Sequence, residues 1–333
     1  MKTYVLVIIA FSSCAFIYGS TSAMNKMALK YFSPEVAMMY RMLIGFLSCL
    51  VIFLYRIFIK QNIKNDLIIF YKTSLTYKLH LIIGSLINLG FPHVLIAIAQ
   101  LWCQSALVQI TKPITPIISQ ILSHFCFHDE PFTFMKFISI LFSLIGVTLN
   151  AIPSFINSNK EYQKKEQGIG FLFILMGVSL FGLASVYFKK FLPNLDITIS
   201  TLFQNLVSFL YCLILSLFIV KPKKIIEETS GASFEGFLWV TLLGVLSSNV
   251  AIHCYMYMIE KIGAVRTNFV PFGQIIIGVL LGIFWLKEWS NYKVWEIVIS
   301  ILGLILIFSA ILFGFFEMSE KEEEEEEVED VSN

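Results

Sequence analysis

The chain has 333 residues, of which 57% are hydrophobic and 14% are charged, and its formal net charge is +1. Soluble domains carry about a quarter charged residues, so this composition excludes an ordinary cytosolic globule. Long apolar windows recur and strict alternation of apolar and polar residues is absent. The sequence therefore predicts an all-α polytopic membrane protein rather than a membrane β-barrel.

Ten apolar windows follow one another along the chain, and each is close to the roughly 20 residues that a helix needs to cross a bilayer. We expect ten transmembrane helices, called spans one to ten, at residues 3–23, 34–59, 79–102, 105–127, 133–153, 168–191, 196–220, 236–259, 263–286 and 292–316. An even number of spans places both termini on the same side of the membrane.

The loop after span two is rich in basic residues, namely Arg56, Lys60, Lys64, Lys72 and Lys78. Basic loops are retained in the cytoplasm, so we expect this loop and both termini to be cytoplasmic. The protein would be a multi-pass component of the plasma membrane or of an endomembrane.

Two stretches of the chain repeat each other at a constant offset of 158 positions, without a gap. The matching residues are Ala106, Pro113, Ile117, Ile118, Leu122 and Glu130 in the first copy, and Ala264, Pro271, Ile275, Ile276, Leu280 and Glu288 in the second. Further upstream, Lys26 and Arg41 match Lys189 and Gln204 at an offset of 163. Spans one to five and six to ten thus form two units, and the odd number of spans per unit predicts an inverted-topology repeat.

The repeat divides the chain into four parts. Residues 1–153 form the first five-helix repeat and residues 168–316 form the second. Residues 154–167, rich in Asn, Lys, Glu and Gln, are expected to link them. Residues 317–333 contain the acidic run from Glu322 to Glu327 and are expected to be a disordered cytoplasmic tail, which either is merely solubilising or recruits a partner.

Both repeats close with the same sequence features, whereas the second departs from the first at its start, where the loop proline is missing. The first half opens with Lys26, Pro34 and Arg41, and the two halves close with Pro113, Glu130 and Gly146, and with Pro271, Glu288 and Gly303. In these features the chain resembles the EamA-like members of the drug/metabolite transporter (DMT) superfamily over residues 3–316, although Gln204 stands at the arginine position of the second half. The resemblance implies a solute carrier that works by alternating access and carries amino acids, nucleotide sugars, sugar phosphates or drugs.

Lys112 lies within the otherwise apolar span four, where a cation costs at least about 2.5–3.5 kcal/mol at the membrane centre. Such a charge needs a cavity, a counter-ion or an anionic ligand, unless it reaches the membrane surface. Gln109, Thr115 and Ser119 share one helix face with Lys112. This polar stripe predicts either a substrate-binding surface or hydrogen bonds between helices.

Four further polar residues are expected to line the passage: His93 in span three, Gln204 in span seven, and Asn249 and His253 in span eight. A buried histidine near neutral pH could carry a proton for coupled transport, whereas a histidine satisfied within the core would have no such role. A proton or a counter-substrate is therefore an expected coupling partner.

Prolines interrupt spans four and nine, and each span ends in a glutamate. Pro113, Pro116 and Pro271 free backbone carbonyls, which predicts either cavity-lining hinges or packing bends. Glu130 and Glu288 are expected to accept hydrogen bonds from the free amides of the next helix.

Small residues at four-residue spacing also recur in these two spans. Gly278 and Gly282 in span nine, echoed by Ser119 and Ser123 in span four, are expected to pack the two spans together, within one protomer or in a homodimer. Arg41 is expected to pair with Glu35 or with neighbouring carbonyls.

The sequence thus predicts an integral membrane transporter that moves a small metabolite through a central cavity between the two repeats. An anionic metabolite is favoured because Lys112 and Arg266 are cations near the passage, and the alternative is an exporter of amino acids or of other neutral or zwitterionic metabolites. A different class remains open: a lipid-modifying enzyme around the cluster from His124 to Glu130, or a scaffold that uses its acidic tail. We expect no catalytic residue, resident metal or cofactor, and no nucleic-acid partner.

Overall fold

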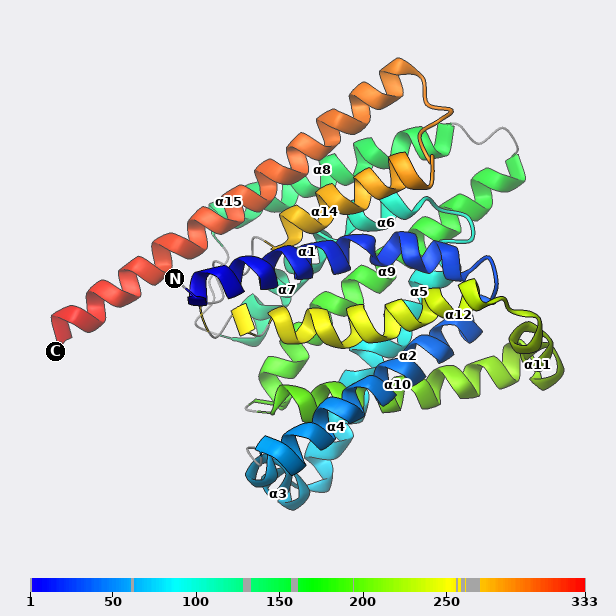
Figure 1. Ribbon diagram of the computed structural model, residues 1–333. Coiled ribbons are helices and arrows are strands. Elements are labelled where there is room, and N and C mark those ends of the chain that lie inside the picture. Colours follow the sequence, from blue (N-terminus) through cyan, green and yellow to red (C-terminus); the bar gives the residue numbers. More distant parts are fainter. Residues whose placement is uncertain are drawn as a thin grey trace.

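The computed structural model describes residues 2–60, 63–127, 133–156, 161–193, 195–255, 257–258, 261 and 270–332, and every regular element within these ranges is helical (Figure 1). The first half contains α1 (Lys2–Ala28), α2 (Pro34–Tyr55), the π-helical turn η1 (Arg56–Lys60), α3 (Lys64–Lys72), α4 (Leu75–Ser85), the π-helical turn η2 (Leu86–Gly90), α5 (Phe91–Ala99), α6 (Ser105–Thr111), α7 (Ile114–Cys126) and α8 (Phe134–Ile156). The second half contains α9 (Glu161–Phe191), α10 (Ile197–Ile219), α11 (Pro222–Gly231), α12 (Phe234–Leu242), η3 (Leu243–Val250), α14 (Val270–Leu280), η4 (Leu281–Trp285) and α15 (Val294–Ser332).

Seven described helical segments are long and apolar enough to cross a membrane. They are Val5–Ala28, Pro34–Phe58, Leu75–Ala99, Lys165–Phe191, Ile197–Ile219, Phe234–Tyr255 and Val294–Phe313. These segments match the predicted spans one, two, three, six, seven, eight and ten. Two shorter apolar helices, Phe137–Pro153 and Gly273–Trp285, lie within the windows of spans five and nine. The prediction of an all-helical, multi-span membrane protein is therefore confirmed.

Helices extend into the segment between the repeats and into the acidic run. Within residues 154–167, α8 continues to Ile156 and α9 begins at Glu161. The run from Glu322 to Glu327 lies within α15, which continues to Ser332. Glutamate has a high helix propensity, and extending an existing helix avoids the cost of starting a new one.

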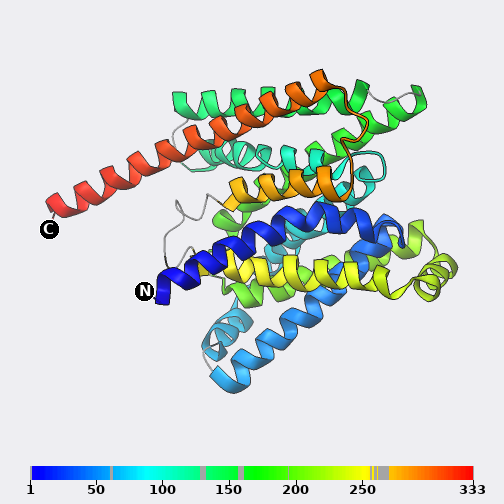
Figure 2. The same cartoon turned by 45° about the horizontal axis from the view of Figure 1, so that its top comes forward.

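The two halves pack against each other through helix pairs that are related by the repeat. In the bundle α2 lies along α10 and α8 lies along α15, while α1 lies along α14, and α9 lies along α7 and α5. Both chain termini lie at the same end of the bundle, in agreement between the two views (Figures 1 and 2). We call this the terminal end, and the opposite end, where α1, α5 and η4 finish, the distal end.

Glycines allow the closest of these contacts. A Cβ atom added to Gly146 of α8 would lie 2.6 Å from the carbonyl oxygen of Gly303 in α15, and one added to Gly303 would lie 2.7 Å from that of Gly146. Gly19 of α1 meets the Gln274 carbonyl of α14 in the way that Gly182 of α9 meets the Thr115 carbonyl of α7. Equivalent glycines thus set the helix spacing in both halves.

Candidate functional site

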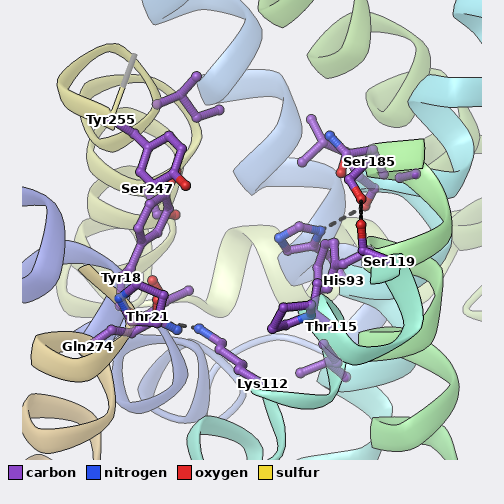
Figure 3. Close-up of a pocket in the computed structure, with 18 of the residues that line it drawn as sticks. Tyr18, Thr21, His93, Lys112, Thr115, Ser119, Ser185, Ser247, Tyr255 and Gln274 are labelled. Atoms are coloured by element: carbon purple, nitrogen blue, oxygen red, sulfur yellow. Dashed lines mark hydrogen bonds between the residues drawn. The ribbon is translucent and has the colours of Figure 1, made fainter. Parts of the chain in front are cut away.

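A cavity of about 820 Å³ lies between the two halves. Side chains from α1, α2, α5, α7, α9, α10, η3 and α14 surround it, and ten of them are labelled in Figure 3. Ser22, Asn25 and Gln100 lie toward its distal end, whereas Leu195 and Ile197 lie near the terminal end. The lining residues therefore extend over most of the length of the bundle, from the level where α1 and α5 finish to the start of α10.

Lys112 enters this cavity from a break in span four. Helix α6 ends at Thr111 and α7 begins at Ile114, because Pro113 has no backbone N–H with which to continue the first helix. The half-buried Lys112 side chain points toward Tyr18, Thr21 and Gln274 (Figure 3). Its Nζ donates to the Tyr18 carbonyl oxygen at 3.4 Å, a long contact that leaves most of its hydrogen-bonding capacity open to a solute.

Arg41 of α2 is the second cation on the cavity wall, although the sequence pointed to another role. It is only 4% exposed, its Nη2 donates to Ser247 Oγ at 3.0 Å, and its Nε has no hydrogen-bond partner. The expected pairing with Glu35 is not among the described contacts. Six residues along an α-helix place the two side chains about 120° apart, so they face different neighbours.

The cavity wall carries an excess of positive charge. Its described lining residues include Lys112 and Arg41 but no aspartate or glutamate. Two cations with no carboxylate among the described lining residues are suited to the binding of an anion.

Three other predicted residues line the same cavity. His93 Nδ1 lies 3.0 Å from the Leu89 carbonyl oxygen, which can only accept, so this nitrogen donates. Gln204 accepts from Asn88 Nδ2 at 2.7 Å and donates to Ser200 Oγ at 2.8 Å. Thr115 donates through Oγ1 to the Val178 carbonyl at 3.1 Å.

Gln109, Asn249 and His253 lie outside the cavity lining, in contrast to the expectation. The fully buried Gln109 donates to the carbonyls of Tyr18 and Gly19, at 3.0 and 2.7 Å. Asn249 donates to the Gly45 carbonyl at 2.8 Å, and His253 Nδ1 lies 2.9 Å from the Asn249 carbonyl. His253 Nε2 also lies 3.5 Å from Thr198 Oγ1 on α10, so each of the three side chains contacts another helix. A spacing along the chain does not fix which neighbour covers a helix face.

Glu288 ties the distal end together, but it caps a different helix from the one expected. Its carboxylate accepts from the backbone N–H groups of Ser105 and Ala106, at 2.6 and 3.0 Å, and from Lys26 Nζ at 3.1 Å. The capped helix is therefore α6 of the other half, not α15. Its repeat partner Glu130 lies outside the described residues, as do residues 128 and 129 of the cluster beginning at His124.

The proline and glycine positions are distributed between the cavity and the helix contacts. Pro113, Pro116 and Pro271 line the cavity. A Cβ atom on Gly278 would overlap the side chain of Gln109, and one on Gly282 would lie 2.9 Å from Ala106 Cβ. Spans four and nine therefore approach through these two glycines within one chain.

The small-residue pattern predicted that Ser119 packs against span nine. In the structure Ser119 faces α9, in span six. Its Oγ lies 2.8 Å from Ser185 Oγ on α9, and both hydroxyls border the cavity (Figure 3).

Several lining residues were missed in the sequence. Tyr18, Thr21, Tyr255 and Gln274 point into the cavity (Figure 3). Tyrosine is common in membrane helices, so its presence does not predict a cavity. Of these four residues, Gln274 could have been predicted to line the cavity, because it is a polar residue three positions after Pro271.

Comparison with known proteins supplies the family context. The sequence model described as "EamA-like transporter family" matches twice, at residues 5–152 and 168–309. A crystal structure of another protein is similar over 94% of this chain and 97% of that chain, with a TM-score of 0.60 and 12% sequence identity, a likeness that concerns the fold alone. No curated protein matches the sequence.

Proposed function

The chain belongs to the EamA-like transporter family, and on that premise we propose that it carries a small anionic metabolite across the membrane by alternating access. Membership of this family makes it a membrane transporter and not an enzyme. In our proposal all ten predicted spans cross the bilayer, as two inverted five-helix repeats.

The charge of the cavity is the observation that carries this proposal. Lys112 and Arg41 both border it, and its described lining contains no carboxylate. An anion between them would replace water with charge-assisted hydrogen bonds, and the planar guanidinium is suited to carboxylate and phosphate groups. A zwitterionic amino acid would place its ammonium group beside these cations without a described carboxylate to receive it.

Alternating access requires that one end of the cavity be closed while the other is open. At the distal end, Lys26, Glu288 and the first amides of α6 form one hydrogen-bonded group. Gln104 adds a hydrogen bond to the Glu288 carbonyl at 3.0 Å. We propose that this group closes the distal end, and that it separates when the cavity turns to face the other side.

Uptake into vesicles containing the purified full-length protein tests the proposal. The panel contains sugar phosphates, dicarboxylates, amino acids and neutral sugars. We expect uptake of an anionic class, and a fall of about 100-fold with Lys112→Gln or Arg41→Gln, because each removes a charged contact to the substrate.

A matched control is Lys224→Gln, which removes an exposed lysine from α11 outside the cavity. It should transport at the wild-type rate. Uptake of neutral sugars or amino acids alone, or wild-type anion uptake by both cavity variants, would contradict the proposal.

A further inference from the structure

A second cavity, of about 600 Å³, lies outside the central site. We call it the α3 groove. Its lining comes from α3, α4 and one residue of α10, and consists of Leu67, Ile68, Phe70, Tyr71, Lys78, Leu81, Ile82 and Phe203. Lys78 is the one charged residue in this lining, and the other side chains are aliphatic or aromatic.

Helix α3 lies at an end of the bundle, between two helical segments that are long and apolar enough to cross a membrane. It connects the end of α2 to the start of α4, at the lower corner of the bundle on the side of the termini (Figure 1). Although it has only nine residues, Ile68, Ile69 and Tyr71 are 53%, 64% and 80% exposed. So much exposed apolar surface on a short helix is typical of a helix that lies at the level of the lipid headgroups.

Packing holds α3 against the bundle. Phe70 is buried, and its ring centroid lies 4.9 Å from that of Phe203 in α10. Phe70 and Leu81 also belong to one apolar cluster with Leu192, which lines the central cavity. The α3 groove is therefore a built feature, and its wall is continuous with that of the transport cavity.

The charge at the groove is basic. Lys78 Nζ donates to the Tyr71 carbonyl at 3.1 Å and lies 5.5 Å from the centre of the Tyr71 ring. In the described structure no carboxylate pairs with Lys78. In sequence, residues 56–78 contain five basic residues and the single acid Asp66. Arg56 is paired with Asp196, at 3.0 Å, so the positive charge nearest the groove comes from lysines.

We propose that the α3 groove binds an anionic phospholipid, with an acyl chain along its apolar lining and the headgroup at Lys78. The groove borders spans three and seven at the membrane surface, where lipid is the molecule always present, and it accepts an apolar chain. The ammonium group and the basic excess select a negative headgroup. This inference goes beyond the transport function and does not depend on it.

Lipid retention by the full-length protein tests the inference. The protein is reconstituted in mixed vesicles of phosphatidylcholine and phosphatidylserine and is then extracted in mild detergent. Native mass spectrometry measures the mass of the protein with its bound lipids. We expect it to retain phosphatidylserine in preference to phosphatidylcholine. Lys78→Gln should lower this preference about fivefold, the effect of one lysine at an anionic surface.

A second variant tests the groove itself. Ile82 is 43% exposed, so Ile82→Trp would fill the groove without entering the core, and we expect it to lose both retained lipids. The Lys224→Gln control at the distal end should leave the preference unchanged. Equal retention of the two lipids by the wild type overturns the inference, and so does unchanged phosphatidylserine retention by either groove variant. Neither result involves the transport assay.

Discussion

The two proline-containing segments that repeat at an offset of 158 match in sequence and differ in the polarity of equivalent residues. Pro113 and Pro271 are equivalent, and both line the central cavity. The preceding residue is Lys112 in the first copy, facing the cavity, and Val270 in the second, which is 1% exposed in an apolar cluster with α1 residues. Duplication thus provides a symmetric frame, and substitutions at equivalent positions place the charge on one side only.

A glycine of the second copy is a further difference between the two segments. Gln120 of the first copy lines the cavity, whereas its equivalent Gly278 makes room for Gln109 of span four. The first copy therefore supplies the charged group of the site, whereas at Gly278 the second copy supplies the space that lets span four approach. Three changes in these segments would break or sharpen this comparison.

Exchanging the charge between the copies should have the largest effect. In Lys112→Val the cavity loses a cation, and we expect anion uptake to fall about 100-fold. Adding Val270→Lys should not restore uptake, because that position is buried among apolar residues, where a charge costs at least about 2.5–3.5 kcal/mol. Uptake into vesicles and melting temperature measure both effects. Restored uptake in the double variant would show that the copies are interchangeable.

Adding a methyl group to Gly278 should have an intermediate effect, on stability. Gly278→Ala would press on Gln109, and we expect a loss of about 1–3 kcal/mol of stability, seen as a lower melting temperature. Gln109→Ser in the same chain should recover part of the loss. The matched control is Gln120→Ala at the equivalent position, which should change the melting temperature little. Equal effects of the two alanines would contradict the assigned difference.

Removing charge from the distal group should have the smallest effect. Glu288→Gln weakens both the cap on α6 and the pair with Lys26, and we expect a loss of about 1 kcal/mol. Lys26→Gln should cost less, because its side chain is 30% exposed and the cap remains.

Cys103 reports on the same end, because its carbonyl accepts from Lys26 and its side chain is buried. In a chain with Cys103 as its single cysteine, Glu288→Gln should raise the alkylation rate more than Lys26→Gln does. If neither variant alters that rate, the group does not close the distal end.

Sequence reasoning identified most of the helices and part of the site. The apolar windows matched seven described helical segments that are long and apolar enough to cross a membrane. Pro113 marked the break that brings Lys112 into the cavity. Sequence reasoning assigned Arg41 to a local pair, whereas Arg41 borders the cavity. A basic residue near the start of a helix is compatible with either environment. Asn249 and His253 are polar, as residues that line a cavity often are. However, Asn249 contacts α2 and His253 contacts α10, and neither lines the cavity.

By itself the sequence determined the helices, their order, the duplication and the breaks at proline, since these follow from local hydrophobicity and backbone chemistry. Tertiary structure alone decided which face of each helix borders the cavity. It also decided that Glu288 caps α6, a helix that begins 183 residues earlier. The physical reason is that a helix face acquires its environment only from the helices packed against it, and here those helices come from both halves of the chain.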